Sequence, residues 1–207
     1  LLPPLSCAMH QIPNHPDYFI TRLPISTSGG KRDAPPGNFG CSMNGWQLAL
    51  VKMDDWQSYH MSVVKTIFWP NAHDDRFPKT AVQGGKYVID SAYDPTVALL
   101  NTNGQGDQLW VSFECAGVGF ATSSCIGPLV GDTGAWHMDL SRITLVVTGT
   151  PSTAASVPKI FSLGGQNFMW FDHFNTANPA VIEARAIELQ SDGKGYFWAA
   201  GKVSSTF

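Results

Sequence analysis

The densest group of chemically active side chains lies in the segment MDDWQSYH, residues 53–60, which contains Asp54, Asp55, Trp56 and His60. A tryptophan beside carboxylates suits stacking against a sugar ring, and a glycoside hydrolase needs two carboxyl groups roughly 5 to 10 Å apart. The two aspartates also fall between two apolar segments, where a turn is expected and where Asp is common. The sequence favours a solvated turn and leaves a sugar site open.

A second polar group is NAHDDRF, residues 71–77, in which His73, Asp74 and Asp75 offer nitrogen and oxygen donors for a divalent ion. Adjacent residues on one loop rarely complete a metal cage without ligands from elsewhere in the chain. We therefore interpret this segment as a polar loop and predict no metal and no cofactor.

Seven tryptophans are present. Those at 110, 170 and 198 lie in strand patterns and are expected in the core or in cross-strand pairs, whereas those at 46, 56, 69 and 136 adjoin turns and could form a binding surface. Trp136 and His137 stand in the loop-like GDTGAWHMD, residues 131–139. The candidate ligand-binding residues are Asp54, Asp55, Trp56, Trp69, His73, Asp74, Asp75, Trp136 and His137.

Other chemistries find little support in the sequence. There is no G-x-S-x-G motif, although six histidines leave open a catalytic triad assembled in space. The glycines of NGQGDQ, residues 103–108, lead into a strand pattern and not into a helix, so they do not fit a phosphate cradle. A net charge of −3 without any run of Lys or Arg argues against nucleic-acid binding.

The four cysteines are Cys7, Cys41, Cys115 and Cys125, and they form no C-x-x-C pair, which argues against zinc. A disulfide between Cys115 and Cys125 could form if the two face each other across a hairpin. Because four cysteines in 207 residues are far from a disulfide-dense scaffold, the composition favours reduced, packed thiols.

Composition and periodicity predict an all-β fold, an antiparallel β-sandwich or a partly closed β-barrel with long loops. Charged residues make up only 14% of the chain, and 20 glycines and 14 prolines punctuate it. We expect one domain over residues 1–207, with 149–158 as a surface connection and a helical turn or two at most in 94–102. The predicted strands lie at 45–53, 58–69, 85–90, 108–116, 142–149 and 166–174.

The segment from Val181 to Val203 predicts a long hairpin with its turn at SDGKG. Alternation should place Ile182, Ala184 and Ala186 on one face of the first strand and Glu183 and Arg185 on the other, with one of the two faces packed.

The C-terminal segment 169–207 resembles the closing strands of the protruding domain of small icosahedral RNA-virus capsid proteins, in particular the calicivirus pattern, and a tetravirus-like or sinaivirus-like relative would also fit. Lys194–Gly195 is inserted before the tyrosine of this pattern. The residues that carry the resemblance are Arg185, Glu188, Asp192, Gly193 and Tyr196.

This resemblance implies a spike excised from a longer capsid protein, assembled in the host cytoplasm and displayed on the virion surface, which self-associates as dimers or trimers. It further implies attachment to a host glycan or protein receptor, capsomere contacts and no catalysis. The alternative is a carbohydrate-binding or glycoside-hydrolase β-sandwich that uses Trp56 with Asp54 and Asp55.

Overall fold

The computed structural model describes residues 9–24, 46–68, 80–82, 87–101, 106–118, 120–191, 197–199 and 205–206. Within these ranges nearly every regular element is a strand, and all strand pairs are antiparallel. The prediction of an all-β antiparallel fold of sandwich type is therefore confirmed. No helix in the described ranges is long and apolar enough to span a membrane.

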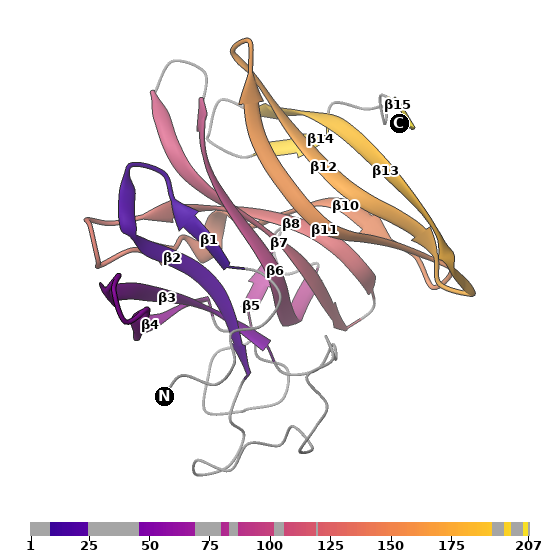
Figure 1. The fold of residues 1–207 in the computed structure, drawn as a ribbon. Coiled ribbons are helices and arrows are strands. Elements are labelled where there is room, and N and C mark those ends of the chain that lie inside the picture. Colours follow the sequence, from indigo (N-terminus) through magenta and orange to yellow (C-terminus); the bar gives the residue numbers. More distant parts are fainter. Residues whose placement is uncertain are drawn as a thin grey trace.

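The strands form three packed sheets that follow one another along the chain (Figure 1). The first sheet has the order β1-β2-β3-β4. The central sheet has the order β10-β8-β7-β6-β5, with β9 beside β8. The third has the order β11-β12-β13-β14, with β15 beside β13.

The bounds of the elements are as follows. The first sheet contains β1 (Met9–Ile12), β2 (His15–Pro24), β3 (Trp46–Asp55) and β4 (His60–Phe68). The central sheet contains β5 (Thr80–Val82), β6 (Tyr87–Asn101), β7 (Asp107–Val118), β8 (Phe120–Val130), β9 (His137–Met138) and β10 (Thr144–Gly149), with the 3-10 helix η1 (Leu140–Arg142) between β9 and β10. The third contains β11 (Thr153–Leu163), β12 (Gln166–Asn175), β13 (Asn178–Ser191), β14 (Phe197–Ala199) and β15 (Ser205–Thr206).

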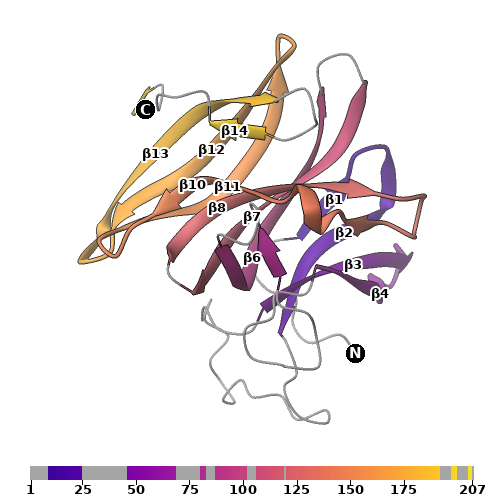
Figure 2. The same cartoon turned by 180° about the vertical axis from the view of Figure 1, so that it is seen from behind.

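The central sheet is buried on both faces, and two hydrophobic cores result. Phe113 of β7 lies in the core shared with the first sheet, together with Leu50 and Phe68. Its neighbour on the other face, Trp110, lies in the core shared with the third sheet. The view from behind shows the first and third sheets on opposite sides of the central one (Figure 2).

Cys115 and Cys125 form a disulfide between the adjacent strands β7 and β8, and both residues are fully buried in the first core. The preference for reduced thiols at this pair is therefore wrong, and the alternative of a hairpin disulfide is the one that the structure adopts. β7 and β8 are adjacent antiparallel strands in which Cys115 pairs with Ser123 and Cys125 with Phe113, so the two cysteines are diagonal neighbours on one face of the sheet. Cys7 and Cys41 lie outside the described residues.

Two segments expected as irregular or helical are strands. Residues 149–158, predicted as a surface connection, end β10, make a tight turn and begin β11, and Ala154 and Ala155 are buried. Residues 94–102, predicted to hold a helical turn, contribute to β6 as far as Asn101. In both segments, burial against a neighbouring sheet outweighs the local preference of small residues and proline for loops.

The C-terminal hairpin forms as predicted, since Leu189, Gln190 and Ser191 of β13 pair with the three residues of β14. The buried face, however, is the one that carries Glu183 and Arg185. Ile187 on that face enters the second core, whereas Ile182 on the opposite face is 59% exposed. Of the three apolar residues predicted to share a face, Ile182 is therefore exposed, Ala184 is half-buried and Ala186 is buried.

A buried polar network connects all three sheets where β6 and β11 are irregular. Arg22 of β2 lies 3.3 Å from Asp94 of β6, measured from Nη1 to Oδ1. Glu114 of β7 accepts a hydrogen bond of 3.0 Å from the backbone N–H of Val157 in β11. Asp94 and Val157 both have positive φ, at 47° and 48°, a conformation that is unusual for a β-branched residue such as valine.

Burial raises the pKa of the Glu114 carboxyl to about 8, with Asp94 adding to the rise, while Val157, Tyr93 and Arg22 oppose it. The folded protein therefore keeps the Glu114 proton over a range where the unfolded chain, with its ordinary glutamate pKa of 4.5, has lost it. Stability should fall as pH rises from about 4.5 to about 8, because ionising Glu114 in the fold is unfavourable.

Glu114→Gln should reduce this loss of stability, because an amide keeps the acceptor for Val157 and carries no titratable proton. We expect the free energy of unfolding of the wild type to drop relative to the variant between pH 5 and 8, on the order of 1.4 kcal/mol for each unit of pKa shift. Urea denaturation at several pH values measures the difference. Burial of His10 lowers its pKa and acts in the opposite direction, but equally in both proteins.

The exposed Asp107→Asn serves as the control and should retain the pH dependence of the wild type. If the free energy of unfolding changed with pH in the same way for the wild type and Glu114→Gln, the raised pKa of Glu114 would be contradicted.

Candidate functional site

The turn between β3 and β4 is formed by Trp56–Tyr59 and is stabilised by the carboxylate of Asp55. Its two oxygens accept hydrogen bonds from the backbone N–H of Gln57 at 2.8 Å and the hydroxyl of Ser58 at 2.6 Å. The bonds from Ser58 and then Gln57 lower the pKa of Asp55. Tyr59 has φ of 52°, and this left-handed residue lets the chain enter β4. The turn interpretation of Asp55 is thus the one that the structure adopts.

Trp56 projects from this turn with 49% of its surface exposed. Its indole N–H donates a hydrogen bond of 2.7 Å to Asp17 Oδ1 on β2, and the ring lies 6.1 Å from that of Phe19 between centroids. A hydrogen bond at one end and an aromatic contact beside it restrict the rotation of the indole. Trp56 is therefore a positioned surface ring.

Other acidic and aromatic residues lie at the same hairpin tip. The imidazole Nδ1 of His60 lies 3.2 Å from Asp54 Oδ2, and the His60 side chain is 68% exposed. Tyr59 is 78% exposed. We call the set Asp17, Asp54, Trp56, Tyr59 and His60 the hairpin-tip surface.

The hairpin-tip surface has the composition of a recognition site for a polar ligand. Its carboxylates accept hydrogen bonds, the phenol of Tyr59 both donates and accepts them, and the rings supply apolar contact area. In the part of the chain that the structure describes, no three His, Cys, Asp or Glu side chains are grouped so that they could hold a metal ion.

Trp136 differs from its predicted role as an exposed aromatic residue. It is only 3% exposed, and its ring makes edge contacts with His15 at 4.7 Å and Tyr18 at 5.3 Å between centroids. The loop folds against the first sheet, where Lys65 donates a hydrogen bond of 2.8 Å to the carbonyl of Ala135. His137, the next residue, is exposed. Trp136 is thus part of the first core.

The remaining predicted residues, Trp69, His73, Asp74 and Asp75, lie outside the described residues. Of the predicted ligand-binding residues, Asp54, Asp55 and Trp56 therefore lie together at the hairpin tip, and the polar loop at 71–77 is outside the described residues.

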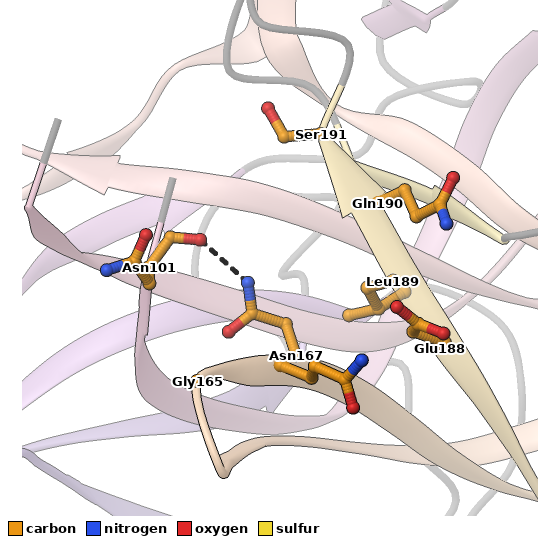
Figure 3. Close-up of a pocket in the computed structure, with 8 residues that line it drawn as sticks. Asn101, Gly165, Asn167, Glu188, Leu189, Gln190 and Ser191 are labelled. Carbon is orange, nitrogen blue, oxygen red and sulfur yellow. Dashed lines mark hydrogen bonds between the residues drawn. The ribbon is translucent and has the colours of Figure 1, made fainter. Parts of the chain in front are cut away.

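A polar pocket of about 330 Å³, which the sequence did not reveal, lies where β6 and β13 end and β12 begins (Figure 3). The side-chain amide of Asn167 donates a hydrogen bond of 2.7 Å to the carbonyl of Asn101, which joins the central sheet to the third. The only sequence signal was a number of Asn and Gln residues at strand ends. The pocket is lined by Asn101, Gly165, Gln166, Asn167, Glu188, Leu189, Gln190 and Ser191.

Comparison with known proteins gives matches among solved structures alone. No protein-family model matches the chain, and no curated protein does. An alpha-L-arabinanase of Cellvibrio cellulosa in complex with arabinohexaose matches at a TM-score of 0.40 and 9% identity, covering 95% of this chain and 79% of the enzyme. An exo-1,5-alpha-L-arabinanase from a bovine ruminal metagenomic library matches at 0.39 and 10%, covering 89% and 74%.

These neighbours contradict the prediction of a capsid spike that attaches to host cells, and the prediction that the chain is not an enzyme. Both are corrected here, since the similar structures are arabinanases. At these scores and identities the likeness concerns the arrangement of strands, and no site residue or substrate is transferred. The resemblance of residues 169–207 to capsid domains, self-association and a virion location stay predictions.

The difference in burial between Trp56 and Trp136 predicts different effects of their substitution on the free energy of unfolding. Trp136→Ala should lower the free energy of unfolding by about 3 to 5 kcal/mol, because it leaves a cavity in the first core. Trp56→Ala should cost about 1 kcal/mol or less, because the ring is half exposed and loses one surface hydrogen bond. Urea denaturation at pH 7 compares the two, and equal losses would contradict the placement of these rings.

Proposed function

We propose that this protein binds carbohydrate at the hairpin-tip surface. The observation that carries the proposal is the half-exposed indole of Trp56, held by Asp17 at 2.7 Å at a hairpin tip that also carries Asp54 and the exposed Tyr59. A sugar ring presents an apolar C–H face and a rim of hydroxyls, and this surface offers a matching partner for each.

The energetics favour a ring that is already in place. The hydrogen bond to Asp17 and the contact with Phe19 limit the rotamers of Trp56 before a ligand arrives, so less conformational entropy is lost on binding. Hydrogen bonds from hydroxyls to carboxylates are stronger than those between neutral groups. Asp17 provides such an acceptor at the indole N–H, and Asp54 carries another carboxylate at the same hairpin tip.

The geometry supports binding more than hydrolysis at this surface. A glycoside hydrolase needs a general acid that stays protonated, which requires a raised pKa. Asp55 has a lowered pKa and its oxygens are engaged by the turn. Among the described carboxyl groups the pKa is raised at Glu114, which is buried between sheets, and at Asp172 of β12, because of burial. Neither belongs to the hairpin-tip surface.

The test is calorimetric titration of the protein with neutral oligosaccharides of glucose, xylose, arabinose and galactose units. We expect at least one to bind, and Trp56→Ala to weaken it tenfold or more because the stacking ring is lost. Asp17→Ala should weaken it less, since the indole remains but is no longer fixed. Leu140→Ala, which removes an apolar side chain that is 43% exposed on η1, is the matched control and should bind like the wild type.

Absence of binding across the panel would overturn the proposal, as would equal affinity of the wild type and Trp56→Ala. Release of reducing sugar that Asp55→Asn abolishes would replace it with hydrolysis at the same surface.

A further inference from the structure

The outer face of the third sheet carries a row of aromatic side chains. Met169 and Phe171 of β12 are buried in the second core, so Phe168 and Trp170, which alternate with them, face outward. Trp170 is 39% exposed. On β11, Phe161 is 37% exposed and stacks on Phe168, with ring centroids 5.7 Å apart and planes 22° from parallel. We call Phe161, Phe168 and Trp170 the aromatic row.

The aromatic row continues into the polar pocket. Glu188 of β13 lies directly opposite Phe168 in the strand register, and Gln166 precedes Phe168 by two residues on the same face. Both residues line the pocket. Asn167 and Leu189, which also line the pocket, alternate onto the face toward the central sheet. The pocket therefore lies at the end of the third sheet, and Gln166 and Glu188 connect it to the aromatic row on the outer face.

The pocket itself has fixed walls. Asn167 is only 7% exposed, and its side chain donates to the carbonyl of Asn101 at 2.7 Å and accepts from the hydroxyl of Ser162 at 2.5 Å. The two-residue turn of Gly164 and Gly165 has φ of 61° and 82°, which glycine adopts without strain, and no atom lies within 4 Å of where a Cβ would stand. The pocket thus lies beside a tight turn that no neighbouring side chain covers.

We propose that the aromatic row and this pocket form a second binding site, whose ligand is a neutral oligosaccharide chain. The amides of Gln166 and Gln190 each present donors and an acceptor, as hydroxyl groups require, and the rings offer faces for stacking. The lining contains one carboxylate and no Lys or Arg, which disfavours phosphate and other anions. A purely apolar partner would leave these polar groups without hydrogen bonds, at a cost in affinity.

This site is separate from the hairpin-tip surface, because the first and third sheets pack on opposite faces of the central sheet (Figure 1). The inference does not require the hairpin-tip surface to bind anything. Two sites on opposite sides of one molecule would let a single chain contact two glycan strands, or one long strand twice, and so raise its avidity for polysaccharide.

The test measures oligosaccharide binding in a Trp56→Ala background, so that the hairpin-tip surface does not contribute. With the same panel of neutral oligosaccharides, we expect retained binding that Trp170→Ala weakens tenfold or more and that Gln190→Ala weakens severalfold. Val181→Ala is the matched control, since Val181 is 57% exposed on the same sheet but alternates onto its other face, and it should leave binding unchanged. Circular dichroism and urea denaturation verify that each variant folds.

The proposal is overturned if the Trp56→Ala protein binds none of the oligosaccharides, or if both Trp170→Ala and Gln190→Ala bind like their parent. It is also overturned if Trp170→Ala changes only the sedimentation coefficient, since the aromatic row would then be a contact between copies of the chain. Binding by this site with no effect of Trp56→Ala would support the second site and contradict the first.

Discussion

The structure depends on one constraint, the burial of the central sheet on both of its faces. Along β7, Phe113 and Cys115 point into the core with the first sheet, while Trp110 points into the core with the third. Each outer sheet therefore packs one face against the central sheet. The other face of the first sheet carries a small buried cluster of Phe19, Val51, Met53 and Met61. Both proposed carbohydrate sites lie on these outer sheets, on opposite sides of the molecule.

The layers are held in register by polar groups as well as by apolar contacts. The hydroxyl oxygens of Thr96 and Ser112 lie 2.6 Å apart, and they lie 3.1 and 2.9 Å from the carbonyl oxygen of Pro158, so the two hydroxyl hydrogens are shared among these three contacts. Glu114 meets the backbone N–H of Val157 beside them. These bonds fall at a bulge of β11, where the ladder with β12 is interrupted, so buried backbone groups released by the bulge find partners on the central sheet.

The sequence predicted the strands whose residues alternate, and it predicted the turn at Asp55 and the C-terminal hairpin. It did not predict β2 or β11. It also missed β8, because both faces of that strand are buried and the small residues of ATSSCIG hide any alternation. It placed Trp136 at the surface, because nothing local shows that the loop folds back onto Tyr18. The polar pocket could not be predicted, since Asn101 and Glu188 meet only through the pairing of distant strands.

Carbohydrate binding at these two surfaces can be tested by nuclear magnetic resonance of the tryptophan indole N–H groups while a binding oligosaccharide is added. Each indole reports its own surroundings, so exposed and buried rings are observed in one experiment. We expect shifts at Trp56 and Trp170, on the two outer sheets, with Trp110 and Trp136 unchanged in the cores. Shifts at Trp110 and Trp136 without any at Trp56 or Trp170 would contradict binding at these surfaces.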